Sequence, residues 1–208
     1  RLVLVLVGVG LPFLAVGATF AIRSDAYTGT HQPIAQPIPF SHEHHAQELG
    51  IDCRYCHTSV ETSTSAGLPS TEICMTCHSQ IWTNAAVLAP LRQSLATGVP
   101  IAWNRVNQLG DFVYFDHAPH VNNGVACVTC HGPVGDMKLT WREQPMQMEW
   151  CLGCHRDPGP NLSPPADEFA SLPADAHAGD GGTAAHAALM QQYGIDPKAM
   201  TDCYVCHR

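Results

Sequence analysis

The sequence has few charged residues, few aromatic residues and no cysteine outside one repeated spacing. Charged residues make up 13% of the 208 positions, and 18 acidic side chains outnumber 10 basic ones. A nucleic-acid-binding protein shows a clustered basic surface; the sequence has no such cluster, so we expect no nucleic-acid partner. Beyond residue 22 aliphatic residues are sparse, which leaves little apolar surface to offset chain entropy.

Charge is absent altogether from residues 2–22, which lie between Arg1 and Arg23. A helix needs about 20 apolar residues to span a bilayer, whereas the apolar region of a cleaved signal peptide is about 7–15 residues long. We therefore expect residues 1–23 to be an uncleaved, single-pass transmembrane anchor in contact with membrane lipid. Pro12 falls inside this segment, and membrane helices tolerate proline.

The sequence is instead rich in cysteine followed by histidine. All ten cysteines fall into C-x-x-C pairs, and a histidine directly follows each pair. In a C-x-x-C-H motif two thioether bonds attach a haem, and the histidine ligates its iron. The predicted attachment residues are Cys53, Cys56, Cys74, Cys77, Cys127, Cys130, Cys151, Cys154, Cys203 and Cys206. The predicted proximal ligands are His57, His78, His131, His155 and His207.

Other uses of paired cysteines fit these motifs less well. C-x-x-C pairs also build four-cysteine zinc sites, and cysteines three residues apart rarely form a disulfide. The histidine after every pair favours five covalently bound haem c groups, whose apolar faces can form the core that the composition lacks. Because haem c is attached on the outer side of the energy-transducing membrane, we expect the haem domain on the periplasmic or outer face of the cell membrane.

An internal repeat supplies further iron ligands. Residues 40–80 and 115–156 each begin with F-x-H-x-x-H and continue through two C-x-x-C-H motifs. Histidines at positions i and i+3 share one face of a turn, so each pair can reach two different haems. The predicted distal ligands are His42, His45, His117 and His120. The sequence leaves open which of them serves which haem.

The distal ligand of the remaining haem has several candidates. Met148 lies three residues before Cys151, and thioether ligation raises a haem's potential relative to two histidines. Methionine also packs readily against aromatic surfaces, so Met148 could serve in that way instead. His177 and His186 are the competing ligands in the C-terminal tail. We take Met148 as the preferred fifth distal ligand.

The expected fold is a multihaem cytochrome c, mostly coil with short α-helices packed around five haems, plus one N-terminal transmembrane helix. Its segments are the anchor 1–23, a linker 24–39, a first di-haem module 40–80, a connecting segment 81–114, a second di-haem module 115–156, and a coil-rich tail 157–208 with the fifth haem. Residues 81–98 are predicted to be helical, with Pro90 interrupting and Gly98 ending the helix. Residues 112–115 are predicted to form a short strand.

Four stretches resemble a known family. They are F-S-H-x-x-H at residues 40–45, G-I-D-C-R-Y-C-H at 50–57, F-V-Y-F-D-H at 112–117 and W-C-L-G-C-H-R at 150–156. With the order and spacing of all five motifs and the anchor, they resemble the pentahaem cytochrome subunit of alternative complex III along essentially the whole chain. The resemblance implies a bacterial quinol-oxidising respiratory complex with iron–sulfur and integral-membrane subunits. Electrons would pass through the haems to a monohaem cytochrome c or a terminal oxidase.

Two other functions compete with this interpretation. A stand-alone membrane quinol dehydrogenase that feeds a periplasmic reductase would itself bind quinol beside the anchor. A catalytic multihaem enzyme would need an iron with an open coordination position, often marked by C-x-x-C-K, whereas all five motifs here end in histidine. No catalytic acid–base pair or nucleophile needs explaining. We therefore expect a non-catalytic electron-transfer subunit.

Overall fold

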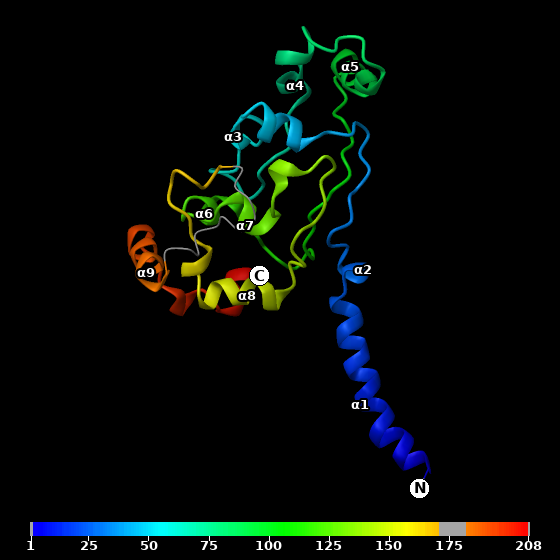
Figure 1. The fold of residues 1–208 in the computed structure, drawn as a ribbon, viewed down its shortest axis with the longest axis vertical. Coiled ribbons are helices and arrows are strands. Elements are labelled where there is room, and N and C mark those ends of the chain that lie inside the picture. Colours follow the sequence, from blue (N-terminus) through cyan, green and yellow to red (C-terminus); the bar gives the residue numbers. More distant parts are fainter. Residues whose placement is uncertain (1, 171–181, 208) are drawn as a thin grey trace.

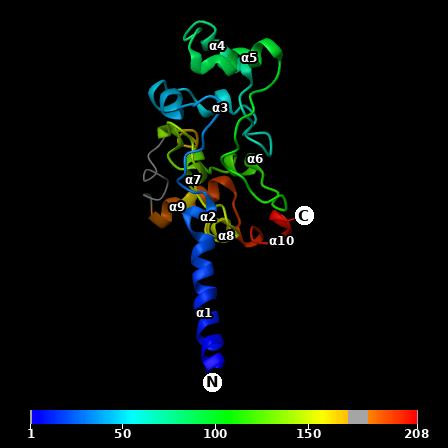
Figure 2. The ribbon, with the colours of Figure 1, turned by 90° about the vertical axis from the view of Figure 1, so that its right-hand side faces the viewer.

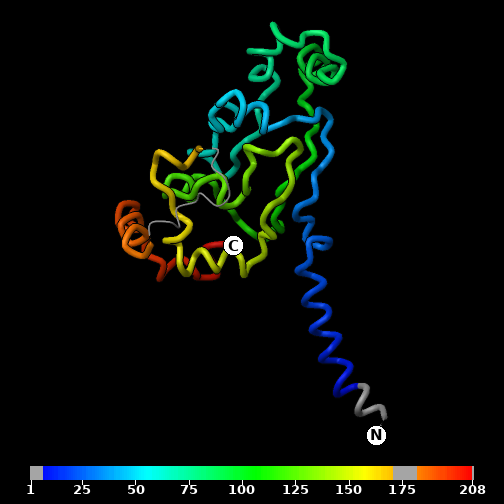
Figure 3. The backbone as a smooth tube through the Cα atoms, viewed as in Figure 1, coloured from blue at the N-terminus to red at the C-terminus, as the bar shows by residue number. Residues whose placement is uncertain are grey.

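The computed structural model describes residues 2–170 and 182–207, with side chains in the first helix described from residue 7 onward. In these residues short helices are joined by long irregular segments, as Figures 1 and 3 show. No strand pairs into a sheet there, and the β-type contact that occurs is an isolated bridge between Thr30 and Arg142. The expected mixture of coil and short helices is confirmed.

The strand expected at residues 112–115 is wrong. The N–H of Tyr114 donates to the carbonyl of Cys206, and the carbonyl of Phe112 accepts from the His207 ring. The apolar run therefore lies beside the C-terminal motif as an irregular segment, because its backbone bonds to that motif and not to a second strand.

The α-helices of the described residues are α1 (Leu2–Arg23), α2 (Asp25–Thr28), α3 (Cys53–Cys56), α4 (Thr71–His78), α5 (Ala89–Thr97), α6 (His117–Val121), α7 (Cys127–His131), α8 (Met148–Arg156), α9 (Gly182–Tyr193) and α10 (Cys203–Cys206). Single turns of π- or 3₁₀-helix add Glu43–Glu48, Ala86–Leu88, Val134–Asp136, Gly159–Asn161 and Pro197–Ala199. Such short helices are marginal alone in water, so contacts within the folded chain must stabilise them.

Helix α1 runs through Pro12 and ends at Arg23. Its described apolar side chains are exposed, with Phe13 at 74% and Phe20 at 75%, and Figures 1 and 2 show it extending away from the remainder of the chain. In the part of the chain whose side chains the structure describes, no helix is both long enough and apolar enough to cross a membrane.

The helix expected at residues 81–98 is shorter than predicted. A 3₁₀ turn begins at Ala86, and Pro90 lies in the first turn of α5, which ends at Gly98 with φ +69°. Proline fits the first turn because the backbone N–H groups there have no partner within the helix. Pro90 therefore starts α5 and does not interrupt it.

The aliphatic core of the described residues is small. Ile38, Leu88 and Leu91 form its main cluster, against which Cys74 and Met75 of α4 pack. The other buried apolar residues are scattered over the chain: Val60, Val121, Ala126, Val128, Met137 and Leu162. That porphyrins supply the missing apolar core stays a prediction.

The helices that carry the C-x-x-C pairs are spread along the long axis of the molecule. In Figures 1 and 2, α4 lies with α5 at the end opposite α1, and α3 comes next. Helices α6 and α7 lie in the middle, while α8 and α10 lie at the end nearest α1. The spatial order of these elements thus differs from their order in the chain.

Candidate haem-binding sites

Each C-x-x-C pair lies on a short helix that ends at or close to its histidine. The pairs occupy α3, α4, α7, α8 and α10, and the ten cysteines form no disulfide with one another. His57 and His207 directly follow α3 and α10, whereas His78 and His131 are the last residues of α4 and α7. His155 lies inside α8, one residue before its end. One helical turn therefore presents both sulfurs and the imidazole of each motif together.

The two F-x-H-x-x-H segments fold into similar turns in which the phenylalanine packs on both histidines. The Phe40 ring centroid lies 5.0 Å from that of His42 and 4.4 Å from that of His45. In the second module Phe115 lies 4.8 Å from His117 and 4.6 Å from His120. The two imidazoles differ in orientation: the first is edge-on to the phenylalanine, and the second has ring planes 24° or 31° from it.

Three of the four predicted distal histidines face a proximal histidine across a gap. The ring centroids are 6.3 Å apart for His45 and His78, 6.4 Å for His117 and His131, and 6.0 Å for His120 and His155. The planes of the His117 and His131 rings differ by only 2°.

This spacing fits one iron between each pair. A metal–nitrogen bond to histidine is about 2.0–2.1 Å long, so two imidazoles on opposite sides of one iron have ring centroids about 6 Å apart. The residues present therefore suit a haem iron with two histidine ligands at these three sites. A direct histidine–histidine contact would place the rings closer together.

His42 and His57 are the corresponding neighbours at the first motif. Burial lowers the pKa of His42 to about 4, and the nearby His57 and His45 add to that effect. Burial also lowers the pKa of His131 to about 4, helped by His117, His57 and His42. Both imidazoles are therefore neutral at neutral pH, the form that ligates a metal.

Hydrogen bonds at Nδ1 separate the predicted ligands from the other histidines. An imidazole that ligates through Nε2 carries its proton on Nδ1 and donates it to an acceptor. Seven predicted ligands have a backbone carbonyl at this position, 2.6–3.3 Å away. The pairs are His45–Ser41, His57–Gly67, His78–Ile81, His117–Thr64, His120–Asp116, His155–Met200 and His207–Phe112.

Gly67 shows why the local sequence matters for one of these acceptors. Its φ of +78° is strained for residues with a side chain, and an added Cβ would come 2.8 Å from the Ser59 hydroxyl. This backbone conformation places the Gly67 carbonyl 2.7 Å from Nδ1 of His57. The glycine after the first motif therefore helps to orient its proximal histidine.

The two remaining predicted ligands contact side chains. Nδ1 of His42 lies 3.1 Å from the Thr140 hydroxyl, and Nδ1 of His131 lies 3.1 Å from Nδ2 of Asn107. Oδ1 of Asn107 is buried without a partner. Amide oxygen and nitrogen are interchangeable by a 180° turn, and the turned amide lets Oδ1 accept the His131 proton. Sequence reasoning missed Asn107 and Thr140 because nothing in their local sequence marks them.

The histidines not expected to ligate have acidic partners. His44 lies 2.7 Å from Glu48, and His31 lies between Asp25 and Glu143. Both side chains are about half exposed, and the His44 ring also lies edge-on to that of His45, with centroids 5.3 Å apart.

Among the described residues, no histidine ring lies opposite His207 in the way that the other three pairs are arranged. In the described residues the ring that stacks on His207 is Phe112, with centroids 5.9 Å apart. Met148, the preferred fifth ligand, begins α8 and is 66% exposed. Nε2 of His186 is buried without a partner, and its side chain packs on Gly159. His177 lies outside the described residues, so the choice among these candidates stays a prediction.

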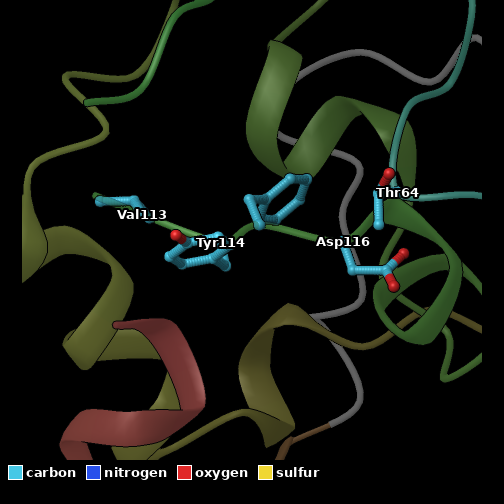
Figure 4. Close-up of a pocket in the computed structure, with 5 residues that line it drawn as sticks. Thr64, Val113, Tyr114 and Asp116 are labelled. Carbon is cyan, nitrogen blue, oxygen red and sulfur yellow. The ribbon is translucent and has the colours of Figure 1, made fainter. Parts of the chain in front are cut away.

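A cavity of about 320 Å³ lies beside the second module. It is lined by Thr64 and residues 113–116, and Figure 4 shows Thr64 and Asp116 at one end and Val113 at the other. Both the N–H and Nδ1–H of His117 donate to the Thr64 carbonyl, while the Tyr114 N–H donates to Cys206. The cavity therefore borders the segments that hold the third and fifth motifs.

Comparison with known proteins agrees with these motifs. A model of the class III cytochrome c family matches residues 19–89, which include the first two motifs. The chain is also similar to the multihaem cytochrome c subunit of menaquinone reductase from Nitratidesulfovibrio vulgaris. The two are 33% identical over 141 residues, which covers 58% of this chain and 67% of the relative.

Proposed function

The chain belongs to the family of multihaem c-type cytochromes, and on that premise we propose that it is the electron-transfer subunit of a membrane quinol-oxidising respiratory complex. Five covalently bound haem c groups would carry the electrons to a monohaem cytochrome c or a terminal oxidase. The observation that carries the proposal is the set of three imidazole pairs with centroids 6.0–6.4 Å apart, each pair joining a C-x-x-C-H motif to an F-x-H-x-x-H turn.

The roles of this chain's residues follow from that geometry. Haem supplies one-electron redox chemistry when bound. The cysteines would attach it, and two histidines would ligate each iron, which would leave no position there for substrate or solvent. The proposed pairs are His42 with His57, His45 with His78, His117 with His131, and His120 with His155. Saturated irons suit electron transfer and do not suit substrate activation.

The relative supports an assembly that uses quinones. Its name describes a subunit of a menaquinone reductase, and the resemblance to alternative complex III implies a quinol-oxidising complex with iron–sulfur and integral-membrane subunits. Both describe a cytochrome that exchanges electrons with a quinone-active partner. The relative's name favours quinone reduction as the second candidate direction.

The anchor is part of the proposal. Residues 2–22 carry no charge, no acid and no histidine that could take protons from quinol. Quinol oxidation releases protons, so the quinol site should lie in a partner subunit. The anchor would instead hold the haem domain at the outer face of the membrane that it spans, and it would raise the effective concentration of the haem domain beside its partners. Part of this stretch lies outside the described side chains, so the proposal depends on the sequence.

The test compares the native membrane assembly with the purified chain. Quinol should reduce the haems within the assembly, and a quinol-site inhibitor should prevent that reduction. The purified chain with residues 1–23 intact should stay oxidised when mixed with quinol. Rapid haem reduction in the isolated chain would identify a stand-alone quinol dehydrogenase. If the assembly instead reduces menaquinone with electrons from an external donor, quinone reduction would be established as its direction.

A further inference from the structure

The first and second attachment sites are direct neighbours. The hydroxyl of Tyr55, inside the first motif, lies 2.9 Å from the hydroxyl of Thr76, inside the second. Phe40 packs on both His42 and His45, at 5.0 Å and 4.4 Å between ring centroids, and the His45 ring lies opposite His78 of the second motif. The first two motifs therefore share a contact surface.

The first site also adjoins the third, although about 70 residues separate them in the chain. A hydrogen bond with Cys53 and burial raise the pKa of Cys127 well above its usual range. Cys53 and Cys127 also contact consecutive residues: the Cys53 thiol donates to the Phe169 carbonyl, and the Cys127 N–H donates to the Glu168 carbonyl. The first site thus has neighbours on two sides.

The second module continues the series. Phe115 packs on both His117 and His120, at 4.8 Å and 4.6 Å between ring centroids, and these two imidazoles lie opposite His131 of the third motif and His155 of the fourth. Cys206 of the fifth motif in turn contributes to the raised pKa of Cys151, behind burial. Nδ1 of His155 donates to the Met200 carbonyl, shortly before the fifth motif. The fourth site therefore lies between the third and the fifth.

Exposure of the motifs agrees with this series. Cys77 of the second motif and Cys203 of the fifth are exposed, whereas the other eight cysteines are partly buried. Helix α7, which carries the third motif, contains the buried residue Val128, and the other four motif helices contain no buried residue. The third site thus has the features of an interior position, and the second and fifth have those of ends.

The fourth site lies on an element that contacts α1. Arg23 pairs with Glu149 in the first turn of α8, and the Gln147 amide donates to the Ile22 carbonyl at 3.0 Å. Helix α8 carries the fourth motif, so the C-terminal end of α1 directly contacts the element that holds that site. Helix α4, with the second motif, lies at the opposite end in Figures 1 and 2.

We propose that the five attachment sites form one series in the spatial order second, first, third, fourth, fifth, with the fourth beside α1, the fifth at the same end of the molecule, and the second farthest from α1. The proposal rests on the proposed function in one respect, since it assumes that all five motifs carry haem. The second and fifth sites are then the terminal positions at which partners exchange electrons with this chain, and electrons cross the full length of the domain between them.

The experiment changes the midpoint potential of one haem site at a time, by substitution of its distal histidine in the purified full-length chain. Methionine in place of a distal histidine raises that site's potential, so the site is reduced before its neighbours. A reduced neighbour carries one positive charge less and lowers the potential of adjacent sites. Midpoints are followed by redox titration with electron paramagnetic resonance. Each low-spin signal is assigned by the variant that removes it.

The number of shifted neighbours distinguishes the two orders. His45→Met, at the terminal second site, should lower one other midpoint, and His42→Met, at the interior first site, should lower two. An arrangement in sequence order reverses these counts and overturns the proposal. His120→Met should lower two midpoints in either case and serves as the control. If methionine fails to ligate, paired Cys→Ala variants of the first or second motif remove the site and its charge, and the number of other midpoints that shift, in either direction, distinguishes the two orders.

Failure of the order is separable from failure of the proposed function. The mass of the purified chain reports how many haems are attached, independently of where they lie. Five attached haems with the reversed counts would reject the spatial order alone, whereas fewer than five would also contradict the haem number on which the proposal depends.

Discussion

The two repeat segments, residues 40–80 and 115–156, have nearly the same local geometry but different surroundings. The second histidine of each F-x-H-x-x-H turn donates to the carbonyl four residues earlier, His45 to Ser41 and His120 to Asp116. Each also faces the proximal histidine of its own module's second motif, at 6.3 Å and 6.0 Å between centroids. The repeat therefore encodes these two sites locally.

The first histidine of each turn depends on the other module. His42 of the first module contacts Thr140 of the second, and His117 of the second donates to the carbonyl of Thr64, in the first. The modules thus exchange supporting contacts at the first and third sites. The comparison teaches that the second histidine of each F-x-H-x-x-H turn is positioned by its own turn, whereas the first is positioned by the contact between the two modules.

The largest expected effect comes from removing a locally positioned ligand. His45→Ala and His120→Ala should each convert one low-spin haem to high spin, because each empties one axial position. Electron paramagnetic resonance of the purified protein measures the change. His44→Ala is the matched control, since His44 pairs with Glu48 and not with a proximal histidine; it should keep every signal low spin. Unchanged spectra in both ligand variants would reject the ligand assignment in both modules.

Asn107→Leu tests the support of His131 in the second module. It leaves the Nδ1–H of His131 buried without an acceptor, which costs about 1–3 kcal/mol of unfolding free energy. Losing the acceptor also makes the ligand less basic, so the midpoint of that site should rise. Asn107→Asp keeps an acceptor oxygen and should lower the midpoint. Denaturant unfolding and redox titration measure both effects, and shifts of the opposite sign would show that Asn107 donates to His131.

Thr140→Val tests the contact between the modules at His42. Loss of one hydrogen bond should cost about 1 kcal/mol of unfolding free energy and raise the midpoint of the first site. Thr140→Ser retains the hydroxyl and should restore both values. If the valine variant instead shifts the midpoint of the second site, His42 and His45 serve the opposite irons.

The smallest expected effect concerns the ion pair between Arg23, at the end of α1, and Glu149, in α8 of the second module. The side chains are 53% and 69% exposed, so solvent screens their attraction, and Arg23→Gln should cost less than about 1 kcal/mol. A double-mutant cycle with Glu149→Gln measures the coupling, which should decrease with added salt. A coupling above 2 kcal/mol, or a changed haem spectrum, would show that the pair supports the fourth site directly.

The sequence alone was sufficient to predict the attachment motifs, the repeat and the coil-rich character, because spacing along the chain determines them. Two cysteines one helical turn apart and a following histidine form a site by local geometry. The F-x-H-x-x-H turn likewise orients His45 and His120 through a carbonyl four residues away. Residues 112–115 show the limit of local reasoning, since an apolar run predicted as a strand bonds instead to a distant motif.

Only the tertiary structure decided what lies beside these local units. Thr140 and Asn107 reach His42 and His131 across 98 and 24 residues of chain, and no sequence spacing marks such contacts. The neighbouring positions of Cys53 and Cys127 arise in the same way. The physical reason is that backbone geometry fixes contacts within one turn, whereas the packing of separate segments fixes the order of the sites and the support of the remaining ligands.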